Sequence, residues 1–409
     1  MNLAAAPPAN LTVESQPAAA SWEAGGRIAS LDGVRGLAIL MVALFHMTVL
    51  PTTGNRFDAR WVNFMALGAS GVTLFFVLSG FLITGILFDS KEKAHYFRNF
   101  YARRALRIFP LYYAVVFVCL VILPQFDHPK ARNFGRIEGE GWWYWLYLSN
   151  LLIFKTGQFR HGVLDVSWSL AIEEQFYLVW PIVVLALNRR ALVWLSGIVV
   201  LIALATRCAM IAGGVNLISV YAFTMSHFDA LAIGAFLALA ARSPAGLGRF
   251  VVPGRIFVLS GVSLLLGLAI AGVYLGGDTP VMMGVGYTLL ALMYGGLLVL
   301  ALEAPAWSRA FANPVLRVLG KYSYALYLFH NPMRALVRDL VYGPESFATF
   351  LGSKMPGQFL FYVLSFAVTL PVAWLSWHLF EKHFLTLKRF FEHGRAPKAP
   401  GAVGAPVAS

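Results

Sequence analysis

The chain has 409 residues, of which 59% are hydrophobic and only 12% are charged, and its formal net charge is +13. Soluble domains carry roughly 25% charged residues, so the composition excludes an ordinary soluble domain and indicates a membrane protein. Strand-length alternation of apolar and polar residues is absent, which argues against an outer-membrane barrel. The basic residues gather in alternate loops, so their excess indicates membrane orientation rather than nucleic-acid binding.

Apolar runs long enough to cross a bilayer recur along the chain, and they predict an all-α, polytopic membrane domain over residues 28–386 with about ten transmembrane helices. Residues 1–27 are rich in Ala and Pro and lack the order of a signal peptide, so we expect a disordered tail. We also expect a disordered cytoplasmic tail over residues 387–409. The expected spans are 36–52, 69–88, 108–124, 169–187, 191–212, 219–241, 256–276, 281–302, 322–342 and 358–385.

Loop charge assigns the two sides of the membrane. Basic residues fill the loops at 91–107, 189–190, 242–255 and 309–321, which places these loops and both termini in the cytoplasm. The aromatic segment at 142–154 is too short to span, and counting it as a span would move residues 189 and 190 outside. We therefore expect a short re-entrant or interfacial helix there, on the outer side.

The first expected span carries Arg35 and His46, eleven residues apart. About three helical turns bring them to nearly one face, roughly 16 Å apart along the axis. An imidazole in a bilayer is costly unless it faces protein or water, and its pKa suits proton transfer near neutral pH. A packed histidine bonded to a neighbouring helix is the alternative. We expect His46 to be a general base or a transient acyl carrier, and Arg35 to orient a donor or offset negative charge.

Two further stretches follow. Ser79 lies in the middle of the second span, where a small residue permits close helix packing; a nucleophilic serine is the alternative. The loop after that span carries Arg103, Arg104 and Arg107, and the first and last of these share a helix face. Topology alone explains their charge. However, guanidinium groups bind phosphate through paired hydrogen bonds, so the cluster also predicts a cytoplasmic phosphate site for coenzyme A.

The fourth stretch opens a span with Glu173 and Glu174 between aromatic and apolar residues. These acids could complement a helix N-terminus as exposed groups. The apolar flanks instead predict that at least one carboxylate enters the membrane zone, beside an inward-facing His or Arg. The topology places the pair near the outer face, and we expect Glu173 and Glu174 among the catalytic residues.

Three more polar residues fall within or at the start of spans, and we expect them in the polar core without an assigned role: Asp32, Asp229 and His330. For His330 a structural or cavity-lining position is favoured, because the proline two residues later frees backbone groups that need partners. The chain has only two cysteines, so no disulfide framework or metal site is expected.

Taken together, these stretches resemble the acyltransferase-3 family of membrane acyltransferases, which includes bacterial sugar O-acetyltransferases and macrolide acyltransferases. The resemblance runs from about Ser30 to Phe384. It rests on Leu31-Asp32-Gly33-Val34-Arg35-Gly36 with His46, on Phe75 to Thr84, on Tyr101 to Pro110, on Trp168-Ser169-Leu170 with Glu173 to Tyr177, and on weaker matches at His227-Phe228-Asp229, Tyr322 to His330 and Phe380-Glu381-Lys382.

The resemblance implies ten transmembrane helices in a bacterial cytoplasmic membrane and transfer of an acyl group, most often acetyl, from acyl-CoA to a hydroxyl. It marks Arg35 and His46 as essential and the arginines at 103, 104 and 107 as donor-associated. The expected acceptor is a cell-envelope glycan or lipid-linked sugar, and the expected surroundings are membrane lipid. The alternatives are a macrolide-like acceptor, or a transporter or flippase without acyl transfer. The sequence does not determine the oligomeric state.

Overall fold

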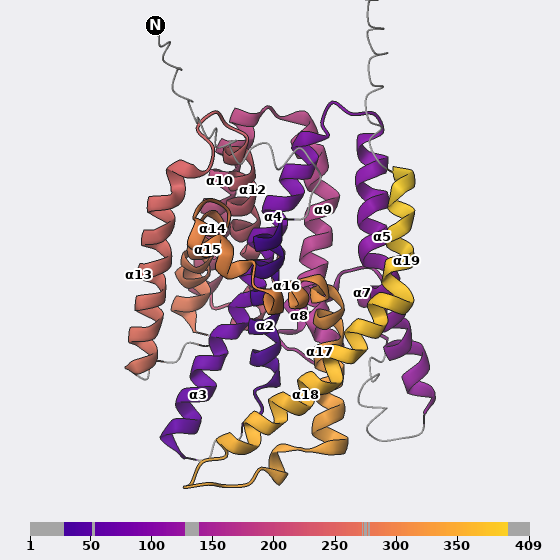
Figure 1. Ribbon diagram of the computed structural model, residues 1–409, viewed down its shortest axis with the longest axis vertical. Coiled ribbons are helices and arrows are strands. Elements are labelled where there is room, and N and C mark those ends of the chain that lie inside the picture. Colours follow the sequence, from indigo (N-terminus) through magenta and orange to yellow (C-terminus); the bar gives the residue numbers. More distant parts are fainter. Residues whose placement is uncertain are drawn as a thin grey trace, which may run out of the picture.

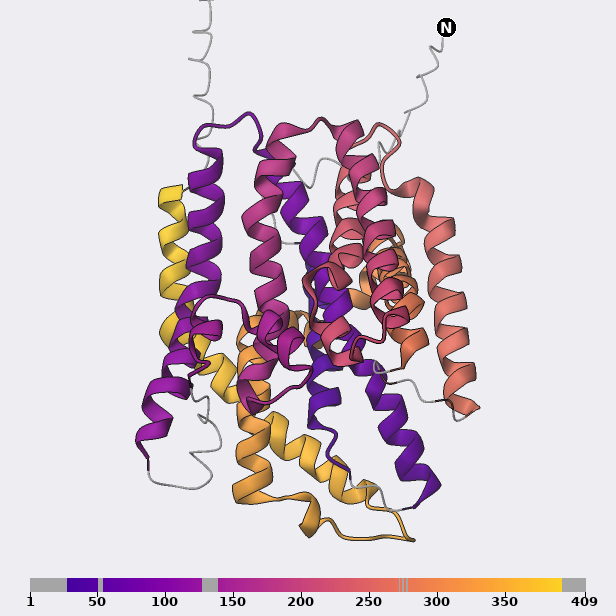
Figure 2. The ribbon, with the colours of Figure 1, turned by 180° about the vertical axis from the view of Figure 1, so that it is seen from behind.

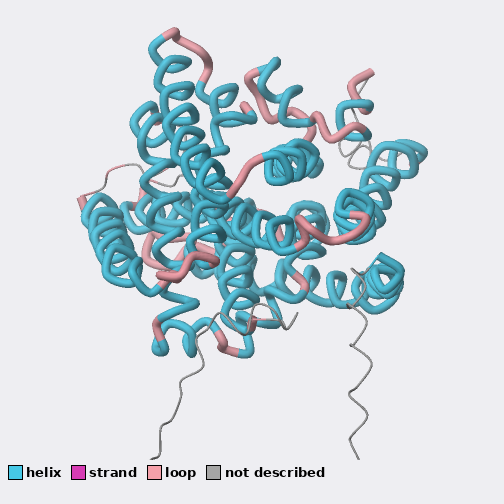
Figure 3. Tube along the Cα trace, turned by 90° about the horizontal axis from the view of Figure 1, so that it is seen from above, coloured by secondary structure: helices cyan, strands magenta, loops and turns pink. Residues whose placement is uncertain are grey.

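The computed structural model describes residues 28–50, 54–126, 139–271, 273, 276 and 279–391, and within them the regular structure is helical apart from one isolated bridge. The expected tail 1–27 and residues 392–409 lie outside the described residues, as do residues 127–138. Helices joined by short loops make up the described chain (Figure 3).

Nine helical segments in this part of the chain are long and apolar enough to span a membrane, which agrees with a polytopic membrane protein. These segments are Ala29–Met47 (α2); Arg56–Asp89 (α3, Arg56–Ala66; a 3-10 turn, Leu67–Ser70; α4, Gly71–Asp89); Tyr96–Gln125 (α5, Tyr96–Phe117; a π turn, Val118–Ile122; a 3-10 turn, Leu123–Gln125); Gly162–Ala186 (a 3-10 turn, Gly162–Ser167; α9, Trp168–Ala186); Arg189–Ala212 (α10); Thr224–Ala241 (a 3-10 turn, Thr224–His227; α12, Phe228–Ala241); Gly248–Ile270 (a 3-10 turn, Gly248–Phe250; α13, Val251–Ile270); Met282–Glu303 (a π turn, Met282–Gly286; α14, Tyr287–Glu303); and Met355–Phe391 (α18, Met355–Ser376; a π turn, Trp377–Glu381; α19, Lys382–Thr386; a 3-10 turn, Leu387–Phe391).

The remaining expected span, at 322–342, is also helical, although it is more polar than these nine segments. It consists of α17 (Ser323–Leu336) and a π turn (Val337–Val341), and it carries His330, Asn331 and Arg334. The chain remains helical through Phe391, five residues past the expected end of the domain at 386. The shorter helices are α7 (Trp142–Trp145), α8 (Ser149–Thr156), α11 (Leu217–Ala222), α15 (Pro305–Phe311), α16 (Pro314–Lys321) and a 3-10 turn (Pro344–Ser346).

Three of the basic connections lie at one end of the molecule. The turns between α4 and α5, between α9 and α10, and between α12 and α13 are all at the top of Figure 1, and the view from behind shows the same arrangement (Figure 2). They carry Lys91, Lys93, Arg189, Arg190, Arg242 and Arg249. The charge pattern in the sequence therefore corresponds to one end of the fold.

The basic segment after the eighth expected span is not a loop at that end. It folds into α15 and α16, which lie at mid-height (Figure 1) and pack against α2. The packing is close because α2 presents glycines: a Cβ added at Gly33 would lie 1.7 Å from the Phe311 carbonyl oxygen, and one at Gly36 would lie 1.9 Å from that of Leu316. The glycines of the first motif thus serve backbone packing.

The aromatic segment at 142–154 forms two short helices rather than the single one expected. α7 and α8 are separated by a turn in which Tyr147 has a φ of +54°. Tyr144, Leu152 and Ile153 are buried, and α8 packs against α9 and α11. The turn redirects the chain, so neither helix is long enough to cross a bilayer.

Candidate functional site

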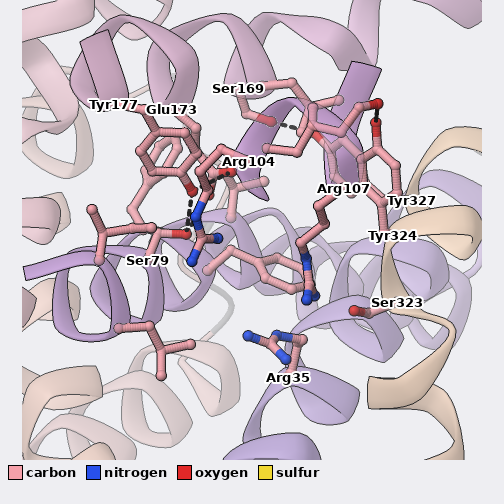
Figure 4. Close-up of a pocket in the computed structure, with 17 residues that line it drawn as sticks. Arg35, Ser79, Arg104, Arg107, Ser169, Glu173, Tyr177, Ser323, Tyr324 and Tyr327 are labelled. Atoms are coloured by element: carbon pink, nitrogen blue, oxygen red, sulfur yellow. Dashed lines mark hydrogen bonds between the residues drawn. The ribbon is translucent and has the colours of Figure 1, made fainter. Parts of the chain in front are cut away.

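A cavity of about 100 Å³ lies between α2, α4, α5, α9 and α17, and we call it the inner cavity. Its charged lining consists of Arg35, Arg104, Arg107 and Glu173 (Figure 4). The three guanidinium groups come from two helices and point toward one space in the close-up. Three cations and one carboxylate give this lining an excess of positive charge, which favours an anionic ligand.

On α5 the inner-cavity pair is Arg104 and Arg107, three residues apart, instead of the expected pair of Arg103 and Arg107. Arg103 is exposed and does not line the cavity, because its side chain points about 100° around the helix from that of Arg104. The Arg104 guanidinium also lies over the Tyr177 ring, 5.8 Å from the ring centroid. Arg35 enters from α2, where its guanidinium lies 3.6 Å from the carboxylate of buried Asp32.

Glu173 and Ser79 meet inside the inner cavity. The Ser79 hydroxyl donates to Glu173 Oε1 at 2.7 Å, and the Tyr177 hydroxyl lies 3.3 Å from both Ser79 Oγ and Glu173 Oε2. Glu174 lines neither this cavity nor the next, and its buried Oε1 has no hydrogen-bond partner in the described part of the chain.

The position of the glutamate pair relative to the outer face stays a prediction, but Glu173 does not lie at the start of its helical segment. The helical path already begins at Gly162, which carries Glu173 to the depth of the arginines on α5.

A second cavity of about 410 Å³, the outer cavity, is larger, and its lining is mostly apolar with several aromatic rings. Its polar lining is His46, Asp165, Asn331 and Arg334. The aromatic lining residues are Phe45, Phe159, Trp168, Tyr221, Tyr287 and Tyr327. Such a lining, apolar with a few placed polar groups, is typical of a small-molecule site.

His46 is half-buried in this outer cavity and is held by α17. The His46 Nδ1 atom lies 3.1 Å from the Val42 carbonyl oxygen and 3.1 Å from His330 Nε2. The Arg334 guanidinium donates to the His46 carbonyl oxygen at 2.8 Å. His46 thus faces a protein cavity rather than lipid, with a second imidazole and a cation beside it.

The two cavities share a wall. Val72 and Tyr327 line both of them, whereas Arg35 lines only the inner cavity and His46 only the outer one. The Tyr327 hydroxyl is held in place because it donates to the Val166 carbonyl oxygen at 2.7 Å and accepts from Ser169 Oγ at 2.5 Å. Val72 and Tyr327 therefore lie between the arginine-lined cavity and the cavity of His46.

At the rim of the outer cavity, the segment before α9 forms a polar cluster. The His161 ring bridges the Tyr144 hydroxyl (2.9 Å) and Glu140 Oε2 (3.2 Å), and its backbone N–H donates to Asp165 Oδ2 at 2.9 Å. Burial lowers the pKa of His161 and raises that of the Tyr144 hydroxyl. Both groups are therefore neutral near pH 7, and they hold Asp165 at the cavity wall.

Asp229 lies apart from both cavities. The buried Arg207 guanidinium donates to Asp229 Oδ2 at 2.7 Å, and its Nε donates to the carbonyl oxygen of Gly284. Thr288 donates to the same carboxylate at 2.7 Å. This network joins α10, α12 and α14. Asp229, which was expected in the polar core, therefore pairs with Arg207 and Thr288 and does not face either cavity.

Sequence reasoning missed several lining residues. Arg334 follows His330 by one turn of α17, and that spacing is the signal that could have identified it. Asp165, Asn331 and Tyr327 have no comparable signal because the fold alone brings them to a cavity. Lys388, from the last helical turn, lies within electrostatic range of Arg103, Arg104 and Arg107.

A family model described as an acyltransferase domain matches residues 28–378 of the chain. The chain is 29% identical over 336 residues to the peptidoglycan O-acetyltransferase of Listeria monocytogenes, a match that covers 77% of this chain and 50% of the relative. It is 26% identical to a putative O-acetyltransferase of Staphylococcus aureus (87% and 57% covered) and 28% identical to a putative peptidoglycan O-acetyltransferase of Bacillus subtilis (88% and 55%). The chain thus spans about half the length of these relatives. No solved structure matches it.

Proposed function

Because this chain belongs to the acyltransferase-3 family, we propose that it is an integral-membrane O-acyltransferase that transfers an acetyl or similar short acyl group from acyl-CoA to a hydroxyl. The donor enters from the cytoplasmic side, and the acceptor is a cell-envelope glycan or lipid-linked sugar in the outer cavity. The observation that carries the proposal is the pair of adjacent cavities, one lined by three guanidinium groups and the other by His46, with Val72 and Tyr327 common to both.

The inner cavity suits the donor. Coenzyme A carries phosphate groups, and guanidinium pairs bind phosphate through parallel hydrogen bonds. Arg104 and Arg107 bind that charged end, and Arg35 orients the arm that carries the thioester. The pantetheine arm is uncharged, so the thioester reaches the wall between the cavities while the nucleotide stays on the side of the basic loops.

The outer cavity suits a sugar. Aromatic rings pack against the C–H faces of a sugar ring, while the polar side chains among them bind its hydroxyls. The names of the relatives support a glycan acceptor, since two of them are described as peptidoglycan O-acetyltransferases. A macrolide-like acceptor would also present hydroxyls on a bulky apolar frame, and it is the second candidate.

In the proposed reaction, a nitrogen of His46 takes the proton of the acceptor hydroxyl while the hydroxyl oxygen attacks the thioester carbonyl carbon. A new C–O bond forms, and negative charge develops on the carbonyl oxygen. The Arg334 guanidinium, on the same side of the wall as His46, offsets this charge. The C–S bond then breaks, and the thiolate of coenzyme A takes the proton from His46, which restores the neutral imidazole.

The test is acyl transfer by the purified full chain in lipid nanodiscs, with radiolabelled acetyl-CoA and either soluble glycan fragments or a lipid-linked sugar as acceptor. We expect a base-labile acetyl ester on the acceptor and release of coenzyme A in equal amounts. A transporter or flippase would release no coenzyme A and would instead move solute across the bilayer of a proteoliposome. Folded protein that transfers nothing from any acyl-CoA would contradict the donor assignment.

A further inference from the structure

The imidazole of His46, which lines the outer cavity, and the buried imidazole of His330 behind it form a chain of hydrogen bonds whose direction can be derived from their neighbours. His330 is fully buried, and its Nδ1 atom lies 2.7 Å from the Tyr327 carbonyl oxygen and 3.1 Å from that of Leu326. A carbonyl oxygen can only accept a hydrogen bond, so Nδ1 of His330 carries the proton. In the neutral ring Nε2 is then the bare nitrogen, and it can only accept.

The same reasoning applies to the imidazole of His46. His46 Nδ1 lies 3.1 Å from the Val42 carbonyl oxygen and 3.1 Å from His330 Nε2, and both of these atoms are acceptors. Nδ1 of His46 must therefore carry its proton and share it between them. The ring centroids are 5.0 Å apart, so the imidazoles are direct neighbours with no room for a bridging group.

We propose that His330 is a positioning residue that holds His46 in the tautomer protonated at Nδ1, which leaves Nε2 of His46 as the basic nitrogen in the outer cavity. The inference rests on the proposed function, and it deepens that function by naming the nitrogen that takes the acceptor proton. Nε2 of His46 has no hydrogen-bond partner among the residues that the structure describes. Catalytic histidines elsewhere depend on a neighbour in this way, since a partner at one ring nitrogen determines the protonation of the other.

The alternative is that His330 only ties its own helix together through the Tyr327 carbonyl. Two substitutions separate these roles, because the two amide side chains reach different ring positions. Asparagine at 330 can donate to the Tyr327 carbonyl in place of Nδ1, but it is too short to reach His46. Glutamine extends an amide oxygen to the place of Nε2, where it can accept from His46 Nδ1.

We expect His330→Gln to keep kcat within about tenfold of wild type, and His330→Asn to lower kcat by about 10²-fold or more, as for the loss of a general base. The acceptor KM should stay within threefold in both variants, because neither change alters the ligand-facing lining of the outer cavity. An Asn variant as active as the Gln variant, or more active, would overturn the proposal. His46→Ala measured in the same assay separates the proposed role of His46 from the proposed role of His330. An active His46→Ala protein would contradict the assignment of His46 as the base.

A measurement on the wild-type protein guards against variants that fold poorly. With ¹⁵N-labelled histidine, the imidazole signals that His46→Ala removes belong to His46. At neutral pH they should be those of the neutral ring protonated at Nδ1. Signals of a neutral ring protonated at Nε2 would overturn the proposal whatever the kinetic result.

Discussion

At the scale of single residues, His46 and His378 carry the same local hydrogen bond and differ in what surrounds it. Each holds Nδ1 against the carbonyl oxygen four residues earlier on its own helix, at 3.1 and 2.8 Å. Only His46 also contacts a second imidazole and lines a cavity. The difference in surroundings separates a candidate base from a histidine bonded within its own helix.

His46→Ala should therefore lower the rate of transfer by about 10²–10⁴-fold, the usual effect of removing a general base. Its unfolding temperature should remain close to that of wild type, because the side chain is only half-buried. Transfer rates and thermal unfolding in detergent measure the two effects. His378→Ala is the matched control and should keep its activity; a His46→Ala rate within threefold of wild type would contradict the assignment.

The arginines of α5 provide a second residue-scale prediction. Arg104→Ala and Arg107→Ala should each raise the acyl-CoA KM by about 10- to 100-fold, since hydrogen bonds to charged groups contribute about 1.5–3 kcal/mol. Lysine at either position should restore affinity only partly, because it lacks the planar fork.

The control for these substitutions is Arg103→Ala. Its side chain is on the same helix and carries the same charge, but it is exposed and outside the inner cavity. Equal donor KM values for all three alanine variants would mean that the cluster serves membrane orientation alone.

At the scale of elements, α2 packs against α15 and α16 through the face that carries its glycines. Gly33 and Gly36 touch the backbones of α15 and α16, and a Cβ at Gly320 of α16 would lie 1.8 Å from the Asp32 carbonyl oxygen. The contact runs in both directions, so α2 and α16 share one interface without side chains between them. This interface positions Arg35 at the inner cavity and, three turns further along α2, His46 at the outer cavity.

Gly36→Ala should destabilise the protein by about 1–3 kcal/mol, the usual effect of inserting a methyl group into a packed interface. Thermal unfolding in detergent should show the loss directly. Gly197→Ala is the control, since it is also a helical glycine but has nothing within 4 Å of the added carbon. A Gly36→Ala protein as stable as this control would mean that the α2–α16 contact is looser than the structure indicates.

The wall between the cavities provides a test at the same scale. Val72→Trp enlarges a side chain that lines both cavities, so it should lower kcat for transfer by more than tenfold by blocking the approach of thioester and hydroxyl. Coenzyme A binding, measured by calorimetry, should stay within threefold because the arginines are unchanged. Val72→Ala should retain transfer, and a fully active Val72→Trp would contradict passage at this point.

Periodicity and charge predicted the helices well, because apolar length and loop charge are local properties of the chain. They missed the short helices α15 and α16, since their folding against α2 depends on Gly33 and Gly36 meeting residues almost 300 positions away. The same limit explains why the span that carries Glu173 begins earlier than expected: the turn at Gly162–Ser167 extends it, and a spacing pattern carries no information about that turn. The spacing of Arg334 one turn after His330 was available in the sequence, but its contact with the backbone carbonyl of His46 depends on the fold.

At the scale of the whole molecule, the grouping of basic connections at one end predicts which face is cytoplasmic. Helix α10 offers a compact test, since exposed positions flank both of its ends. With Cys119 and Cys208 replaced, a cysteine at Arg190 should react only with reagents that reach the cytoplasm, and one at Gly213 only with reagents applied outside. Labelling of position 190 from outside would reverse the orientation of the fold and, with it, the direction of transfer.

The two cavities share only two lining residues, and this separation has a consequence for how the protein can change. In the proposed enzyme, substitutions at Tyr221 and Tyr287 of the outer cavity should alter which hydroxyl compound fits, and neither residue lines the inner cavity. In the proposed enzyme, single substitutions can therefore change the acceptor specificity, in evolution or by design, while the binding of the acyl donor stays the same. Val72 and Tyr327 lie between the two cavities, so in the proposed enzyme changes at these two positions should affect the transfer step rather than the choice of acceptor.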